Sequence, residues 1–198
     1  MTPEQRPHPL HSGERRLARI LQAVILHTNC HFKDSLESVA QFVEAYKPLK
    51  EELEVQLKQT SDPNAFYRYL AQLSQQNQTT ELSLQLKRVI NAALADARLR
   101  RLLRHIVQMD REAAILEEML EDSQSASARD IITSTLTILT SNRDLVVADA
   151  GQAAMTRIQR VYDELNGLLS QALRIKYETL RAQRSTLKKE KFLDRNSI

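Results

Sequence analysis

Residues 80–122, TELSLQLKRVINAALADARLRRLLRHIVQMDREAAILEEMLED, decide the fold of this chain because they hold neither Gly nor Pro. We expect them to form one unbroken helix, on the order of 60 Å long at about 1.5 Å per residue. From residue 92 onward, apolar residues recur in alternating steps of three and four, which is typical of a left-handed coiled coil. The positions are Ala92, Ala95, Leu99, Leu102, Ile106, Met109, Ala113, Leu116 and Leu120.

A second apolar seam with the same period follows at residues 147–175. The Ser-rich segment SQSASARD, residues 123–130, separates the two seams and predicts a turn, with Ser127 and Asp130 as a capping pair. Two long helices joined by a short turn predict an antiparallel hairpin whose seams bury against each other and against copies or partners. The second seam comprises Val147, Ala150, Ala154, Ile158, Val161, Leu165, Leu168, Ala172 and Ile175.

The N-terminal part predicts further helices. One helix should begin near Ser12 or Gly13 and end near Tyr46, with a kink or short break at Pro48, since proline disfavours helical geometry at the residue before it. Asp62 and Pro63 suit the cap and the first position of a short helix. The stripe expected to be buried in the first helix contains Leu21, Ile25, Thr28, Phe32, Leu36, Val39, Val43 and Tyr46.

The expected organisation has four parts. They are a flexible N-terminal arm at 1–13, a helical unit at 14–78, a long helical hairpin at 79–190 and a frayed basic tail at 191–198. With 3 Gly, 5 Pro and no Trp in 198 residues, the composition favours long helices over sheets. We therefore expect an all-α, elongated helical bundle, and an oligomer that covers the remaining apolar surface.

Catalytic motifs are missing from the sequence. It has no Gly-rich phosphate loop, no nucleophile elbow and no nucleophile paired with a base. We expect a protein that is not an enzyme and has neither a cofactor nor a small-molecule substrate. Cys30 is the single cysteine, no apolar run approaches the roughly 18 residues of a membrane span, and MTPEQRPHPLHSGERR lacks an apolar signal core. These features favour the cytoplasm.

The segment HTNCHFKD, residues 27–34, gathers four potential metal ligands. On one continuous helix, His27, His31 and Asp34 would share a side, whereas Cys30 would point away from them. No second His or Cys cluster supplies a fourth ligand. We therefore interpret the segment as a boundary between core and water and expect no metal. A helical metal-binding protein that uses His27, His31 and Asp34 is kept as a second alternative.

Basic residues cluster at two places. Arg98, Arg100, Arg101 and Arg104 lie in ARLRRLLRH, and an acidic stretch, DREAAILEEMLED, follows them. This alternation favours pairing in which the Arg block of one subunit meets the Glu block of another. Lys188 and Lys189 belong to a second basic run near the C-terminus, part of which complements the helix dipole.

The functional expectation is a non-catalytic helical scaffold or adaptor that acts through coiled-coil self-assembly and partner-helix binding. Its expected contacts are Arg98, Arg100, Arg101, Arg104, Lys188 and Lys189, and its partner is another protein or a further copy of the chain. One alternative uses the same basic helix faces for peripheral binding to an anionic membrane surface or to nucleic acid.

Overall fold

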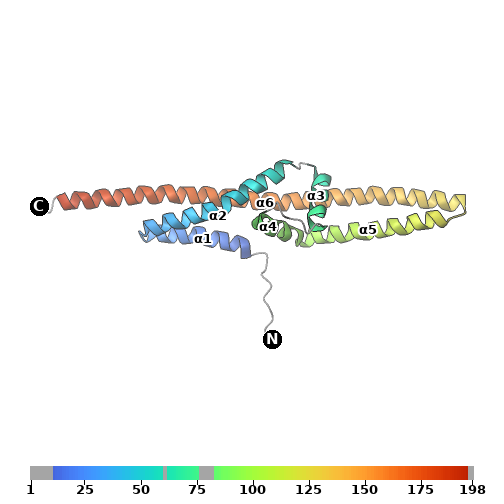
Figure 1. Cartoon of the computed structure of the whole chain (residues 1–198), viewed down its shortest axis with the longest axis horizontal. Helices are drawn as coiled ribbons and strands as arrows, with labels where there is room; N and C mark the ends of the chain where they lie inside the picture. Colours follow the sequence, from blue (N-terminus) through green and yellow to red (C-terminus); the bar gives the residue numbers. More distant parts are fainter. Residues whose placement is uncertain (1–10, 60–61, 76–82, 196–198) are drawn as a thin grey trace, which may run out of the picture. The chain divides into compact units, whose positions relative to one another are not determined.

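The computed structural model describes residues 11–59, 62–75 and 83–195, and these form helices without any strand (Figure 1). This confirms the all-α prediction. The predicted arm at 1–13 lies outside the described residues except for its last three, which begin the first helix. The helices are α1 (His11–Thr28), α2 (Phe32–Gln59), α3 (Pro63–Gln75), α4 (Leu84–Leu94), α5 (Ala97–Asp122) and α6 (Ala126–Arg195).

The chain divides into two compact units. Among the described residues, unit 1 comprises 11–52 and 162–195, and unit 2 comprises the described residues between 53 and 161. Both α2 and α6 contribute to the two units, because each is one continuous helix across the boundary. The two units therefore interleave along the chain, since unit 1 contains both its first and its last part.

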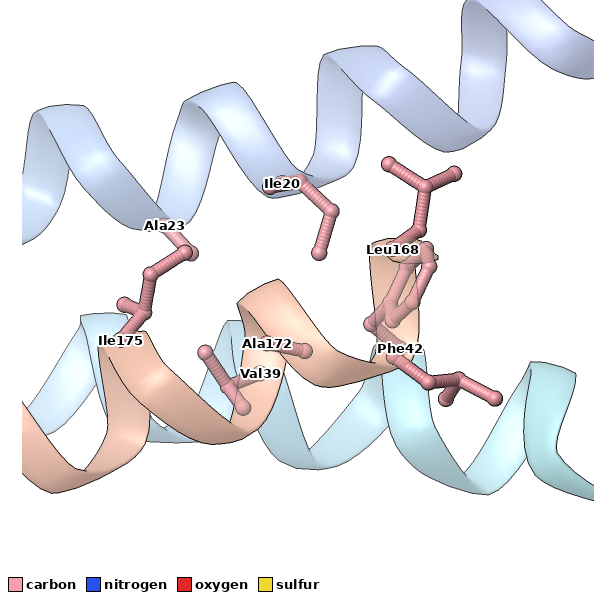
Figure 2. Packing of buried hydrophobic residues seen from close by; sticks show 8 residues of the cluster. Ile20, Ala23, Val39, Phe42, Leu168, Ala172 and Ile175 are labelled. Carbon is pink, nitrogen blue, oxygen red and sulfur yellow. The ribbon is translucent and has the colours of Figure 1, made fainter. Parts of the chain in front are cut away.

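Unit 1 is a bundle of α1, the first part of α2 and the second part of α6 (Figure 1). Figure 2 shows the side chains of its core pointing toward one another from the three helices. Ile20 and Ala23 come from α1, Val39 and Phe42 come from α2, and the α6 side chains fill the space between them. The α6 members of the cluster are Leu168, Leu169, Ala172 and Ile175.

A tight turn separates α1 from α2, so the prediction of one helix from Ser12 to Tyr46 is wrong. The N–H of His31 donates to the carbonyl of Leu26 and the N–H of Cys30 donates to that of His27, which is the bond pattern of a Schellman cap. Cys30 supplies the left-handed residue of this cap, with φ of 61°. The sequence gives little sign of this turn, because that position is usually glycine.

The stripe predicted for the first helix is consequently wrong in α1. Leu21, Ile25 and Thr28 are exposed, whereas Ile20 and Ala23 are buried. In α2, Val39 is buried as predicted. Of the kink or short break predicted at Pro48, the break does not occur, because α2 continues through this residue to Gln59.

Unit 2 contains the antiparallel hairpin, formed by α5 and the first part of α6 (Figure 1). Its turn is shorter than predicted, and the capping pair of Ser127 and Asp130 is wrong because both residues lie inside α6. Ser125 caps α6 instead, since its Oγ accepts from the N–H of Ala128 at 3.5 Å. The guanidinium of Arg143 on α6 forms an ion pair with Asp110 on α5.

The helix predicted to be unbroken over residues 80–122 is interrupted at Asp96, and residues 80–82 lie outside the described part. The Asp96 carboxylate accepts from the backbone N–H groups of Arg98 and Leu99 at 2.9 and 3.2 Å and so caps α5. The helix positions that are buried also shift at this break. Ala93 is buried in α4, whereas the predicted seam residue Ala95 is exposed.

Beyond the break, the first seam is buried only in part, because Leu102, Ala113, Leu116 and Leu120 are half-buried. Leu99, Ile106 and Met109 are buried, and the second seam is buried from Val147 to Ile175 apart from the partly buried Val161. The last part of the second seam packs on different helices from those predicted. Leu168, Ala172 and Ile175 pack on α1 and α2 in unit 1 rather than on α5. The cap predicted at Asp62 is confirmed, with Oδ2 accepting from the Ala65 N–H at 2.9 Å.

Candidate interaction surfaces

The segment HTNCHFKD is a structural turn. His27 places Nδ1 2.9 Å from the Thr179 Oγ1, His31 lies 3.7 Å from the Asp34 carboxylate at the surface, and Cys30 is exposed. Among the residues that the structure describes, no group of three or more His, Cys, Asp or Glu side chains is arranged to hold a metal ion. The arrangement of His27, His31 and Asp34 thus gives the metal alternative no geometric support.

A buried polar cluster joins the three helices of unit 1 beside this turn. The Ser35 hydroxyl donates to the Ala23 carbonyl at 2.8 Å and lies 3.5 Å from the Thr179 hydroxyl, which also meets His27. Ser35 and Thr179 are fully buried. Because buried hydroxyls cost free energy unless they are hydrogen-bonded, this cluster fixes how α1, α2 and α6 align.

Charged contacts strengthen unit 1 at the other end of α1. Arg16 is almost fully buried and makes a two-pronged hydrogen bond to the Glu164 carboxylate, at 3.0 and 3.1 Å from Nη2 and 3.2 Å from Nε. Lys50 lies 5.5 Å from the ring centre of Tyr162, within cation–π range. These groups are committed to contacts within the fold, so they are poor candidates for a binding site.

A polar cluster also crosses the hairpin of unit 2. The hydrogen bond from Arg143 to Asp110 raises the pKa of the guanidinium. Burial raises the pKa of the nearby Tyr67 hydroxyl, and Arg143 opposes that shift. Both shifts favour the forms that these side chains ordinarily adopt at physiological pH, a neutral Tyr67 and a charged Arg143.

The predicted arginine patch is exposed at the start of α5. Arg98, Arg100, Arg101 and Arg104 all present their side chains to solvent, and none forms an ion pair with another described residue. The backbone hydrogen bond from Leu99 is the main cause of the lowered pKa of Asp96, and Arg100 adds a smaller electrostatic contribution. All four arginines are thus accessible to solvent.

The second predicted basic group is also accessible. Lys188 and Lys189 are exposed near the end of α6. They belong to a C-terminal segment, residues 173–191, that has seven basic and two acidic residues. Among the described residues, no helix combines the length and apolar character needed to cross a bilayer.

Sequence reasoning missed two apolar stripes on the outer face of α6. Ile131, Ile138 and Leu145, here called the hairpin stripe, are each more than 60% exposed. Leu173, Leu180 and Leu187, here called the C-terminal stripe, are 46–58% exposed. Both stripes repeat every seven residues, and this period is visible in the sequence. The buried seam of the same helix has the same period, so the period alone does not distinguish an exposed stripe from a buried seam.

The hairpin stripe lies on a thinly packed part of unit 2. Residues 110–146 are all described, and each of them is exposed or only partly buried. On α5, Ile115 and Met119 add further exposed apolar area, at 57% and 52%. Because two helices alone bury little surface, this segment gains stability from any further helix that covers it.

The exposed segments carry opposite charge. The hairpin segment, residues 110–149, has nine acidic and three basic residues and a formal charge of −6. The C-terminal segment at 173–191 has a formal charge of +5. Each therefore combines an apolar stripe with a net charge that the other complements.

Comparisons of this chain with protein-family models, with curated proteins and with solved structures find no match.

Proposed function

We propose that this protein is a non-catalytic helical scaffold or adaptor that acts by self-assembly and by binding partner helices. The observation that carries the proposal is the pair of exposed stripes on α6, in which Ile or Leu recurs every seven residues. Helices bind one another through apolar residues at this spacing, flanked by charged residues that select the partner. An exposed apolar face of this kind is typical of an interaction site.

The proposal is tested by light scattering coupled to size-exclusion chromatography, over a range of protein and salt concentrations. We expect a defined species with a mass that is a multiple of 22.7 kDa. A mass of 22.7 kDa at every concentration and salt level would contradict self-assembly. Because exposed charges are screened by salt whereas apolar contacts are not, the salt response separates the two contributions.

A second candidate function is favoured by the exposure of the basic residues. Arg98, Arg100, Arg101 and Arg104, together with Lys188 and Lys189, are accessible to an anionic membrane surface or to nucleic acid. Cosedimentation with phosphatidylserine vesicles, with phosphatidylcholine vesicles as control, tests the membrane version. Binding that falls steeply with salt and is abolished by Lys188→Glu with Lys189→Glu would favour this candidate over the scaffold.

The arginine patch has its own test. Reversal of Arg100, Arg101 and Arg104 to Glu leaves the buried seam of α5 unchanged, so we expect the helical content to be retained. Loss of assembly or of partner binding would assign the patch to an interface. Retention of both would show that the patch is only a solvated face, and assembly would then rest on the apolar stripes.

A further inference from the structure

The two stripes of α6 occupy one heptad position. Leu145 and Leu173 are 28 residues, or four heptads, apart, so the stripes share a phase along a single continuous helix. The three positions of that phase between them are polar: Gln152, Gln159 and Asn166. Every residue of this phase from 131 to 187 is exposed. The outer face of α6 is thus apolar at both ends and polar in the middle.

This pattern is symmetric about residue 159. If a second α6 lies antiparallel with Gln159 opposite Gln159, then Ile131 faces Leu187, Ile138 faces Leu180 and Leu145 faces Leu173. Gln152 faces Asn166 in the same register, so polar residues also meet polar residues. If one α6 helix is shifted by seven residues along the other, the apolar residue at the inner end of a stripe lies opposite Gln or Asn instead. A symmetric pattern of this kind is what a two-fold contact between identical chains requires.

The net charges of the hairpin segment and the C-terminal segment favour this antiparallel arrangement over a parallel one. Parallel pairing in register would also place apolar residues together, but it would bring the hairpin segments, each −6, beside each other and likewise the C-terminal segments, each +5. Antiparallel pairing places each C-terminal segment, +5, beside a hairpin segment whose −6 divides into −5 on α5 residues 110–122 and −1 on α6 residues 126–149. Because like charges at an interface are repulsive and opposite charges select the partner, the antiparallel arrangement is favoured.

From these observations we infer that the partner of the hairpin stripe is the C-terminal stripe of a second copy of this chain, docked antiparallel. The inference rests on the proposed function, because it names the partner and the register of that self-assembly. It also gives the hairpin stripe, which lies in the thinly packed residues 110–146, a partner that covers it.

Site-specific cross-linking tests the register. In a Cys30→Ser background, Ile138→Cys and Leu180→Cys are prepared as separate proteins, mixed in equal amounts and treated with a short bismaleimide. We expect a cross-linked dimer in the mixture and little in either protein alone. Thr140→Cys, which is exposed on the same helix but off the stripe, is the control in place of Ile138→Cys. Efficient cross-linking of Ile138→Cys to itself would indicate parallel pairing and overturn the inference.

Charged residues on the stripes give a second test that does not depend on cross-linking. Ile138→Lys and Leu180→Glu should each weaken dimerisation at least about tenfold, because each removes an apolar contact at two symmetric sites. Antiparallel pairing places the two new charges opposite each other, so the double variant should recover part of the affinity. Failure of the double variant to recover any affinity would contradict the antiparallel register.

Matched controls separate this inference from the proposed function. Val107 and Leu21 are exposed apolar residues of unit 2 and unit 1 that lie off the α6 stripes. Val107→Gln and Leu21→Gln should leave the dimer dissociation constant within about twofold. If these controls weaken assembly whereas Ile138→Gln and Leu180→Gln do not, self-assembly stands and the proposed interface is wrong. If the unmodified chain is a monomer throughout, both proposals fail.

Discussion

Gly151 on α6 lies directly against the backbone of Pro63, the first residue of α3. A Cβ built on Gly151 would stand 1.9 Å from the Pro63 carbonyl oxygen, a distance that no real contact allows. Helix interiors disfavour glycine, so its presence here is explained by this close approach between two elements of unit 2.

We predict that Gly151→Ala destabilises the protein by about 1–3 kcal/mol, because the backbone of α3 must move to admit one methyl group. Gly167 in the same helix is the matched control, since nothing lies within 4 Å of the Cβ that alanine would add there. Gly167→Ala should stabilise by about 0.5–1 kcal/mol. Urea denaturation of both variants checks the pair, and equal effects would contradict the role given to Gly151.

Cys30 adopts a left-handed conformation at the cap that ends α1. Because residues with a Cβ pay about 1 kcal/mol or more in this region and glycine does not, Cys30→Gly should raise stability by roughly 0.5–1 kcal/mol. Thermal denaturation measures the change. Cys30→Ala is the control, since it removes the thiol while keeping the Cβ, and it should be close to neutral. Destabilisation by Cys30→Gly would mean that this turn is not a Schellman cap.

We predict that the ion pair between the buried Arg16 and Glu164 stabilises unit 1. Glu164→Gln removes the negative charge that meets the buried guanidinium and should cost about 1–3 kcal/mol, less than a fully buried pair because Glu164 is partly exposed. Arg16→Met fills similar volume without a charge and should cost less. A double-mutant cycle in chemical denaturation gives the coupling energy, and coupling near zero would show that the pair adds no stability.

Asp96 is predicted to stabilise α5 more strongly when its carboxyl group is ionised. Its pKa is lowered from the ordinary value of 3.8, chiefly by the hydrogen bond from the Leu99 N–H. A lowered folded-state pKa contributes stability that is present above the unfolded-state value and is lost as the pH falls through the folded-state value. Asp96→Ala should therefore cost about 1 kcal/mol at neutral pH and less in acid.

Asp96→Asn provides the control for this pH dependence. Asparagine caps a helix about as well as aspartate but does not titrate, so its stability relative to alanine should remain constant over the same acidic range. Denaturation midpoints at neutral and acidic pH measure both differences. A constant difference between aspartate and alanine down to strongly acidic pH would refute the role of the ionised cap.

Two turns show where sequence reasoning reaches its limit. The Asp62–Pro63 start of α3 was predictable because both residues act locally, through a carboxylate cap and a fixed φ. The turn at Cys30 was not predictable from the sequence. Whether a residue other than glycine adopts the left-handed conformation is decided by how the helices on either side of it pack. The break at Asp96 lies between these cases: aspartate is a good cap residue, yet the uninterrupted apolar period around it favoured a continuous helix.

The candidate surfaces were partly predictable for a similar reason. The exposure of the basic groups at Arg98–Arg104 and at Lys188 and Lys189 could be predicted from the sequence, because charged residues almost always face water. The apolar stripes of α6 were not recognised, because a residue such as Ile138 has the same spacing as a core residue. Only the exposure of each side chain in the folded structure shows which of the apolar lines on α6 remain uncovered.

By itself, the sequence determined that this protein is all-α, that α5 and α6 carry apolar seams with a heptad period, and that no local catalytic motif is present, because these features depend on neighbouring residues along one helix. The tertiary structure decided where the first helix turns and which helices cover each part of α6, so that Leu168, Ala172 and Ile175 pack on α1 and α2. It also decided that Ile138 and Leu180 remain exposed. These outcomes depend on contacts between residues far apart in the chain, which a periodic pattern on a single helix does not specify.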